Sequence, residues 1–353
     1  MRWPAWGYAV GSEGTRNKEQ GTRQGSPAPV RVGVIGAGAM GANHARVFGA
    51  LPDAELVAVA DSDAARLDAL SPRRRLRAYQ DYRRLLDEER PDAVSIAVPT
   101  RLHAEVALVC IERGVPVLVE KPLAASVDEG EQVRAAAEAG GVPLMVGHVE
   151  RFNPAVQELA RRLRAGRLGR VYQAAARRLG PFYPRARDVG VAYDLATHDI
   201  DVLRLLLDCE VEQVQAGAVR GVRTEFEDAL AGLLRFEDGA MAVLEANWLT
   251  PVKVRELSVF GERGMCTVDY IAQTLRWYTL LPDAESAAEE AAVPNAGEEP
   301  LRAELAFFLR VARGDVPPPV TAADGIAAMR VADALVESAH WGGAVRLAGR
   351  AAT

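Results

Sequence analysis

The sequence predicts an α/β plus α+β protein, in which a doubly wound parallel sheet is followed by a domain built on a large, mostly antiparallel open sheet. Two observations point to this fold class. Apolar, strand-like runs alternate with helical patterns between residues 30 and about 147, whereas closely spaced β-rich runs dominate after about residue 150. The first pattern is typical of a parallel sheet covered by helices, and the second of antiparallel strands joined by turns.

The first domain is expected to span residues 30–150. Its strands are continuously apolar, as residues 93–98 illustrate, because strands of a covered parallel sheet are buried on both faces. The expected strands are 30–36, 55–60, 92–98, 115–119 and 143–147, and the expected helices are 40–51, 62–70, 81–89, 101–113 and 126–139.

The second domain is expected to span residues 151–345. Residues 282–300 are acidic, alanine-rich and broken by prolines, which favours a surface loop. The two last helices are free either to stay with this domain or to pack back on the first. We expect helices at 154–165, 193–207, 301–313 and 323–340, and strands at 170–179, 211–220, 229–236, 240–248, 254–260 and 264–270.

Composition and charge narrow the class of protein. The chain has 353 residues, of which 49% are hydrophobic and 25% charged, and its net charge is −6, which argues against a general nucleic-acid or membrane surface. Cys110, Cys209 and Cys266 lack the spacing of metal ligands, so no metal is expected. No run approaches the roughly 20 apolar residues of a membrane span. We therefore expect a cytoplasmic protein, with residues 1–29 as a disordered or non-native extension.

Residues 36–41, Gly-Ala-Gly-Ala-Met-Gly, form a complete GxGxxG turn between an apolar strand and a helical stretch. In a dinucleotide-binding Rossmann domain the first glycine permits a tight turn, the second lets the backbone approach a pyrophosphate, and the third allows close packing of helix on strand. Gly36, Gly38 and Gly41 fit these roles. Ala39 and Met40 would open the helix whose N-terminus faces the anion.

Asp61 supplies the second half of this fingerprint. It ends the next apolar strand, 20 residues after Gly41, where a carboxylate binds the ribose hydroxyls of the cofactor. A carboxylate there repels the 2′-phosphate of NADP, and the next basic residue is Arg66, so NAD is the expected cofactor. The alternative is that Asp61 is a turn or N-cap residue before the helix at 64–70.

Two further features carry chemistry. Lys121 follows the strand 115–119 and so lies at the edge of the parallel sheet where ligands bind. Asp194 and His198 are four residues apart, which places both side chains on one face of a helix. The alternatives are a surface charge or phosphate contact for Lys121, and a surface pair for Asp194 and His198.

These residues together resemble the Gfo/Idh/MocA oxidoreductases over residues 30 to about 343. The resemblance is carried by the GAGAMG turn, the Val-Pro-Thr-Arg-Leu-His segment at 98–103, the Glu-Lys-Pro motif at 120–122 and the Asp194 to His198 pair. It implies that Lys121, Asp194 and His198 flank the substrate carbon that exchanges hydride with the nicotinamide. Asn is more usual in the family where Thr100 stands. The implied cofactor contacts beyond residues 36–61 are Pro99, Thr100, His103, Glu120 and Lys121.

Oxidation of a secondary alcohol with NAD needs a base for the hydroxyl proton. A neutral imidazole suits that task, so His198 is the expected base, and Lys121 would stabilise the developing alkoxide. Asp194 would orient the hydroxyl or favour the protonated imidazole, and Asn153 could hold a neighbouring substrate oxygen. Lys121 as the base is an alternative that the sequence leaves open.

The substrate is expected to be anionic, because four arginines fall within residues 177–188. Arginine forks match phosphate oxygens, and prolines stiffen this segment. The alternative is a solvated loop or a salt-bridge patch. Trp248 stands in a segment with two cations that could help to hold a nucleotide, although core packing explains it as well. The arginines are Arg177, Arg178, Arg185 and Arg187.

These segments resemble a subgroup of the family that oxidises UDP-N-acetylglucosamine at C3 to a 3-keto sugar, and this is the function we expect. The alternatives are a myo-inositol or simple-sugar dehydrogenase of the same family, and a non-catalytic NAD-binding regulator. The open sheet needs a cover for its second face, so a homodimer or homotetramer is expected, as in the family. The sequence leaves open whether NADH is released or recycled in place.

Overall fold

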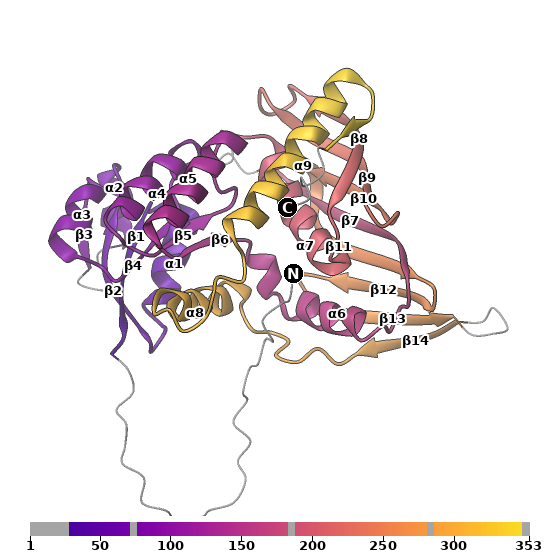
Figure 1. Cartoon of the computed structure of the whole chain (residues 1–353), viewed down its shortest axis with the longest axis horizontal. Coiled ribbons are helices and arrows are strands. Elements are labelled where there is room, and N and C mark those ends of the chain that lie inside the picture. The colour runs from indigo at the N-terminus through magenta and orange to yellow at the C-terminus, as the bar shows by residue number, and fades with distance from the viewer. Residues whose placement is uncertain (1–27, 71–75, 183–187, 281–285, 348–353) are drawn as a thin grey trace, which may run out of the picture.

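A computed structural model describes residues 28–70, 76–182, 188–280 and 286–347. Two sheets lie beside each other, each with helices and a hydrophobic core of its own (Figure 1). The first sheet is parallel and the second almost entirely antiparallel, which confirms the expected fold class. Most of the expected N-terminal extension, residues 1–27, lies outside the described residues.

The first sheet has the strand order β3-β2-β1-β4-β5-β6, with every neighbouring pair parallel. This is the Rossmann order, in which ligands bind beyond the carboxyl ends of the strands near the point where the order reverses. Its elements are β1 (Val30–Ile35), α1 (Ala39–Phe48), β2 (Ala54–Ala60), α2 (Ala64–Leu70), β3 (Arg77–Tyr79), α3 (Tyr82–Glu89), β4 (Ala93–Ile96), α4 (His103–Glu112), β5 (Val117–Glu120), α5 (Val127–Gly140) and β6 (Leu144–Gly147).

Within the described residues, the second sheet has nine strands in the order β14-β13-β12-β11-β7-β10-β9-β8-β15, of which only β7 and β10 pair in parallel. Helices α6 and α7 and the C-terminal part of α9 cover its inner face. The strands are β7 (Val171–Pro181), β8 (Val211–Arg220), β9 (Glu227–Phe236), β10 (Met241–Asn247), β11 (Leu249–Gly261), β12 (Gly264–Asp269), β13 (Thr274–Leu280), β14 (Ser286–Ala291) and β15 (Val345–Arg346), and the helices are α6 (Pro154–Arg164), α7 (Thr197–Leu207) and α9 (Ala322–Trp341).

The expectation of a loop over residues 282–300 is wrong for β14. Its alanines and glutamates are depleted in strands generally, so local propensity argues against one. Pairing with β13, from Leu275 opposite Ala291 to Leu280 opposite Ser286, decides the structure instead. The sequence analysis also did not predict strand β13 or the two short strands β3 and β15.

The last two helices join the domains. Helix α8 (Pro300–Ala312) shares the core of the parallel sheet through Leu305 and Phe308. Helix α9 contributes Met329 to that core and Leu335 to the core of the second sheet, and in Figure 1 it runs between them in yellow. Between these helices, the carbonyl of Val320 accepts a hydrogen bond from the amide of Val146 on β6, at 3.1 Å.

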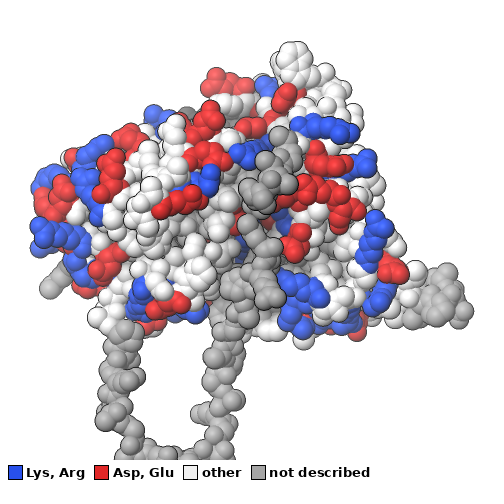
Figure 2. Space-filling model, viewed as in Figure 1, with Lys and Arg blue, Asp and Glu red and all other residues white. Residues whose placement is uncertain are grey.

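Apolar side chains remain on the outer face of the second sheet. Leu233, Met241 and Val243 are each more than 40% exposed, and Val243 stands directly opposite Leu233. On the face drawn in Figure 2, basic and acidic side chains are interspersed over both domains. Among the residues that the structure describes, no helix is long and apolar enough to cross a membrane.

Candidate active site

The turn between β1 and α1 meets the requirements of a dinucleotide site. Gly36 has a φ of 99°, and a Cβ there would lie 2.4 Å from the carbonyl oxygen of Ala97. A Cβ on Gly41 would lie 1.8 Å from the carbonyl oxygen of Gly36. A Cβ on Gly38, by contrast, would meet nothing within 4 Å, so the backbone is open there. Gly38 is also the N-cap of α1 and offers no side-chain cap, which leaves the N–H groups of the first turn for a pyrophosphate.

Asp61 lies at the carboxyl end of β2 and faces this turn. Its Oδ2 accepts a hydrogen bond from the amide of Ala37 at 2.7 Å, and its Oδ1 accepts one from Asp63 at 2.9 Å. Asp63, rather than Asp61, accepts from the amide of Ala65 in the first turn of α2, so the N-cap alternative is not needed for Asp61. Asp61 lines a pocket of about 450 Å³, and Gly36 and Pro99 line it too.

Two residues expected to contact the cofactor, His103 and Glu120, form polar contacts with other groups of the protein. The imidazole of His103 is buried, with Nδ1 2.7 Å from the carbonyl oxygen of Pro122 and Nε2 2.9 Å from that of Val98. The buried carboxylate of Glu120 lies 2.9 Å from Nε2 of His44. Both side chains therefore hold strand ends and helices of the first domain in place, and their contact with the cofactor stays a prediction.

Lys121 and Asp194 meet across the two domains. Nζ of Lys121 donates to the carbonyl oxygen of Asp194 at 2.7 Å and to its Oδ1 at 3.1 Å. The lysine side chain is only 13% exposed, so it is not a surface charge. Thr100 strengthens this junction, because its amide donates to Oδ2 of Asp188 at 2.9 Å.

The segment that carries Asp194 is a π-helix, Ala192–Ala196, which runs directly into α7. An α-helix was expected here. Single π-turns are rare and occur frequently at functional sites. The turn is anchored by the amide of Ala192, which donates to Glu227, and by the hydroxyl of Thr197, which donates to the carbonyl of Tyr193.

His198 lies beside this contact. Its Nδ1 is buried and has no hydrogen-bond partner in the described part of the chain. Burial lowers the pKa of His198 well below the usual value, and the positive charges of Lys121, Arg178 and Arg255 lower it further. The imidazole is therefore neutral near pH 7, which is the form that accepts a proton.

His148 is a residue of the site that the sequence reading did not assign. It follows β6, and because Gly147 pairs with Glu120, it stands next to Lys121 at the same sheet edge. The side chain is 2% exposed, and neither ring nitrogen has a hydrogen-bond partner among the described residues. Burial lowers its pKa. Its place directly after a strand of the parallel sheet was the signal that could have found it.

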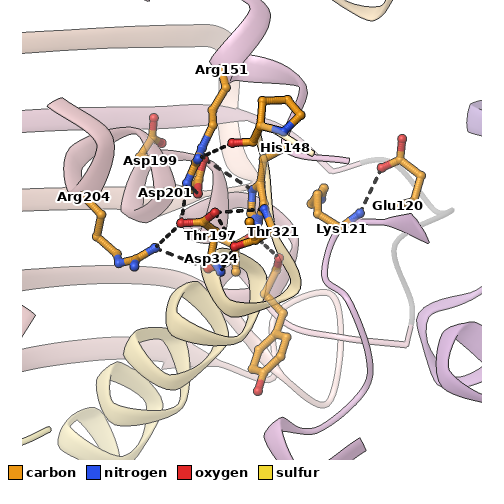
Figure 3. A network of polar contacts seen from close by, with 12 residues as sticks. Glu120, Lys121, His148, Arg151, Thr197, Asp199, Asp201, Arg204, Thr321 and Asp324 are labelled. Carbon is orange, nitrogen blue, oxygen red and sulfur yellow. Dashed lines mark hydrogen bonds and ion pairs between the residues drawn. The ribbon is translucent and has the colours of Figure 1, made fainter. Parts of the chain in front are cut away.

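A buried network of charges fixes the segment behind His148 (Figure 3). Arg151 donates through Nε to Oδ2 of Asp201 on α7 at 2.7 Å and through Nη1 to the carbonyl of Pro319. Asp324 on α9 lies 3.2 Å from Nη2 of Arg151. These contacts tie together the linker after β6, the linker before α9 and helix α7, which carries His198.

Two residues expected to bind substrate form hydrogen bonds within the second domain. Oδ1 of Asn153 caps α6 by accepting from the amide of Ala155, and its Nδ2 donates to the carbonyl of Tyr270 at 3.0 Å. Trp248 is 4% exposed, and its Nε1 donates to Oδ1 of Asp228 at 2.6 Å. Buried partners thus account for the polar atoms of both side chains, and substrate binding by either residue stays a prediction.

Two of the four arginines predicted to bind an anion, Arg177 and Arg178, do not lie together in the structure. Arg177 and Arg178 are neighbours on β7, so they point to opposite faces of the sheet. Arg177 lies on the outer face and forms ion pairs with Glu245 at 3.1 Å and Glu256 at 3.5 Å. Arg178 is buried on the inner face, 2.7 Å from Asp199 and 2.9 Å from Glu150. Arg185 and Arg187 lie outside the described residues.

Comparison with known proteins agrees with this arrangement. The family described as "Oxidoreductase family, NAD-binding Rossmann fold" matches residues 30–148, and the GFO/IDH/MocA C-terminal domain matches residues 156–267. The chain belongs to the Gfo/Idh/MocA oxidoreductase family. As a member, it is an NAD-dependent dehydrogenase.

Several family members are similar over most of the chain. A UDP-N-acetylglucosamine 3-dehydrogenase of Acidithiobacillus ferrooxidans is 32% identical over 87% of this chain and 96% of its own length, and its structure has a TM-score of 0.79 with 88% and 97% covered. An inositol 2-dehydrogenase of Saccharopolyspora erythraea is 35% identical over 61% of this chain and 66% of its own. The WlbA dehydrogenase of Bordetella pertussis, solved with NADH and UDP-GlcNAcA, is 25% identical with a TM-score of 0.82, covering 92% and 99%.

Proposed function

We propose that this enzyme oxidises the C3 hydroxyl of UDP-N-acetylglucosamine to the 3-keto sugar nucleotide, with NAD as the oxidant. The observation that carries the proposal is the positive surroundings of His198. Lys121 and Arg178 are paired with carboxylates, but Arg255 forms no ion pair in the described part of the chain, and its positive charge lowers the pKa of this imidazole. A sugar nucleotide is anionic and gains from that field, whereas inositol is neutral and does not.

The residues at the cleft divide the chemical work. Bound NAD supplies the hydride acceptor. Neutral His198 takes the hydroxyl proton, because burial and the nearby cations keep the ring unprotonated until the alcohol reacts. Lys121 Nζ directs two of its three N–H groups at Asp194 and has a third for the developing alkoxide. In this proposal Lys121 stabilises charge and His198 is the base, because the ammonium is held in an ion pair.

The test follows NADH formation by the purified full-length protein with UDP-N-acetylglucosamine, free N-acetylglucosamine and myo-inositol. We expect the sugar nucleotide to give the highest kcat/KM. Reduction of the product with borodeuteride, followed by mass spectrometry and NMR, would place the label at C3. A higher kcat/KM with myo-inositol or the free sugar overturns the proposal, and so does a label at another carbon.

A neutral polyol is the second candidate substrate, favoured by the similarity to the inositol 2-dehydrogenase. The same assay decides between the two. The contact between Lys121 and Asp194 argues against the third reading, a regulator without catalysis, because a binding protein needs no ammonium aimed at the reaction centre. Failure to reduce NAD with any sugar, polyol or nucleotide sugar would favour the regulator.

We also propose that two copies of the chain associate through the outer face of the second sheet. Leu233, Met241 and Val243 form an exposed apolar strip there, and the ion pair of Arg177 with Glu245 lies on the same face. An apolar centre with a charged rim is typical of a protein interface. Light scattering should report a dimer or tetramer that Val243→Glu reduces to a monomer, whereas Ile271→Glu, at an exposed turn, should not. A monomeric wild-type protein would contradict this.

A further inference from the structure

Two cations of β11, Lys253 and Arg255, lie near Gly180 on β7, and the charge of Arg255 acts on His198. In the register of the sheet, Arg255 stands directly opposite Arg178, so both side chains are on the inner face. A Cβ on Gly180 would lie 3.9 Å from Nη1 of Arg255 and 3.9 Å from Cγ of Lys253, which shows that both side chains flank this glycine. The two cations therefore lie beside the end of β7.

The cations differ in how their charge is balanced. Arg178 forms ion pairs with the carboxylates of both Asp199 and Glu150, and these carboxylates act on Arg255 only from a greater distance. Arg255 donates only to the carbonyl oxygens of Leu179 and Val254. In the described part of the chain, neither Lys253 nor Arg255 forms an ion pair.

The pKa values of Arg255 and Lys253 reflect the absence of an ion-pair partner for either side chain among the described residues. Burial and the charge of Arg178 lower the pKa of Arg255 to about 10. Burial and the charge of Arg255 lower the pKa of Lys253. A partly buried charge with no counter-ion is costly, and an anion bound between the two side chains would offset that cost.

The positions of the cations indicate the shape of the anion. Arg255 is partly buried and Lys253 is exposed, so the positive charge that has no ion-pair partner extends from inside the site toward solvent. The charge of Arg255 acts on the pKa of His198, and Lys253, two residues earlier on β11, is exposed and so lies on the solvent side of Arg255. The ligand should therefore carry its negative charge at a distance from the carbon that reacts.

We propose that Lys253 and Arg255 form the subsite that binds the diphosphate of a nucleotide sugar, with the sugar ring directed at His198. This rests on the proposed function and replaces the expectation for Arg177, whose guanidinium is paired on the opposite face of the sheet. The planar guanidinium of Arg255 suits two phosphate oxygens, and the flexible ammonium of Lys253 suits one.

The experiment compares Arg255→Met and Lys253→Met with the wild-type full chain, and uses Arg276→Met, an exposed arginine on β13, as the matched control. Binding of UDP is measured by calorimetry, independently of turnover. We expect each site variant to weaken UDP binding and to raise KM for the sugar nucleotide by about tenfold or more, with the Kd of NAD unchanged. The control should bind UDP as the wild type does.

A conservative variant and a second readout keep the test decisive. Arg255→Lys retains the charge and should recover part of the lost affinity, and the effect of the two Met substitutions should shrink at high salt. The inference is overturned if UDP binds both Met variants as tightly as the wild type, or if the wild type does not bind UDP. If both Met substitutions weaken UDP binding but UDP-N-acetylglucosamine is not the sugar nucleotide that is oxidised, the proposed function is wrong. The proposal of a diphosphate subsite at Lys253 and Arg255 is then still supported.

Discussion

Lys121 Nζ lies 3.1 Å from Oδ1 of Asp194, and this ion pair joins the two domains at the point where chemistry is expected. Lys121 follows β5 of the parallel sheet, and Asp194 belongs to the π-helix before α7. Each residue alone is an ordinary charged side chain. Together they aim an ammonium at a fixed position beside His198, so the catalytic geometry depends on how the domains pack.

Asp194→Asn should therefore lower kcat more than it alters cofactor binding. The amide keeps the side-chain size and leaves the backbone carbonyl contact to Lys121, but removes the negative charge that holds the ammonium in place. We expect kcat to fall by up to about a hundredfold, the loss associated with a misplaced catalytic group. Asp315→Asn, at an exposed aspartate, is the control. Unchanged kcat in Asp194→Asn would show that the ion pair does not position Lys121.

His198→Asn should lower kcat by about 10²–10⁴, the usual contribution of a general base. The pH profile is the sharper readout. Burial and neighbouring cations lower the pKa of His198, so in the wild type kcat/KM should fall only at a pH below the ordinary histidine value of about 6.5. That acidic limb should disappear in the variant. If it persists, another group is the base.

The sequence revealed the features whose function follows from local spacing. The GxGxxG turn, Asp61 after a strand, and Lys121 at a strand end all depend on neighbours in the chain, and the structure places them where the pattern indicates. The hydrogen bonds of Asn153 with Tyr270 and of His103 with Pro122 could not be predicted, because these partners are distant in sequence.

The prediction that Arg177 and Arg178 belong to one anion-binding segment failed for a different reason. Residues 177–188 were treated as one segment, although Arg177 and Arg178 fall within the strand expected at 170–179 and within β7, so they lie on opposite faces. Alternation along the expected strand was enough to separate these two arginines. The unbalanced charge of Arg255 could not be found that way, because it depends on which carboxylates the fold assigns to Arg178.

The two glycines at the start of α1 should respond differently to alanine. A Cβ at residue 38 meets nothing within 4 Å, so Gly38→Ala should fold normally but obstruct the pyrophosphate and weaken NAD binding by about tenfold or more. A Cβ at residue 41 would overlap the carbonyl oxygen of Gly36, so Gly41→Ala should also lower the free energy of unfolding by about 1–3 kcal/mol. Calorimetric NAD titration and urea unfolding separate the two effects. Equal stability loss in both variants would contradict this reading of the turn.

Buried histidines should make the protein less stable in mild acid. Burial lowers the pKa of His103, His148 and His198 in the folded state, whereas the unfolded chain titrates near 6.5. The unfolded state therefore binds more protons as the pH falls below about 6.5, and stability is lost there, at about 1.4 kcal/mol per pH unit for each histidine that stays neutral.

The variant that tests this is His148→Phe, which removes one such histidine without adding a charge. The free energy of unfolding, measured by urea between pH 8 and 5, should decline less steeply in the variant than in the wild type, whatever its value at pH 8. His340→Gln changes an exposed histidine of α9 and should leave the slope as it is. The slope is the deciding quantity, because a merely altered packing would shift the whole curve without changing its dependence on pH. A His148→Phe curve parallel to the wild type would mean that His148 takes up its proton in the folded protein.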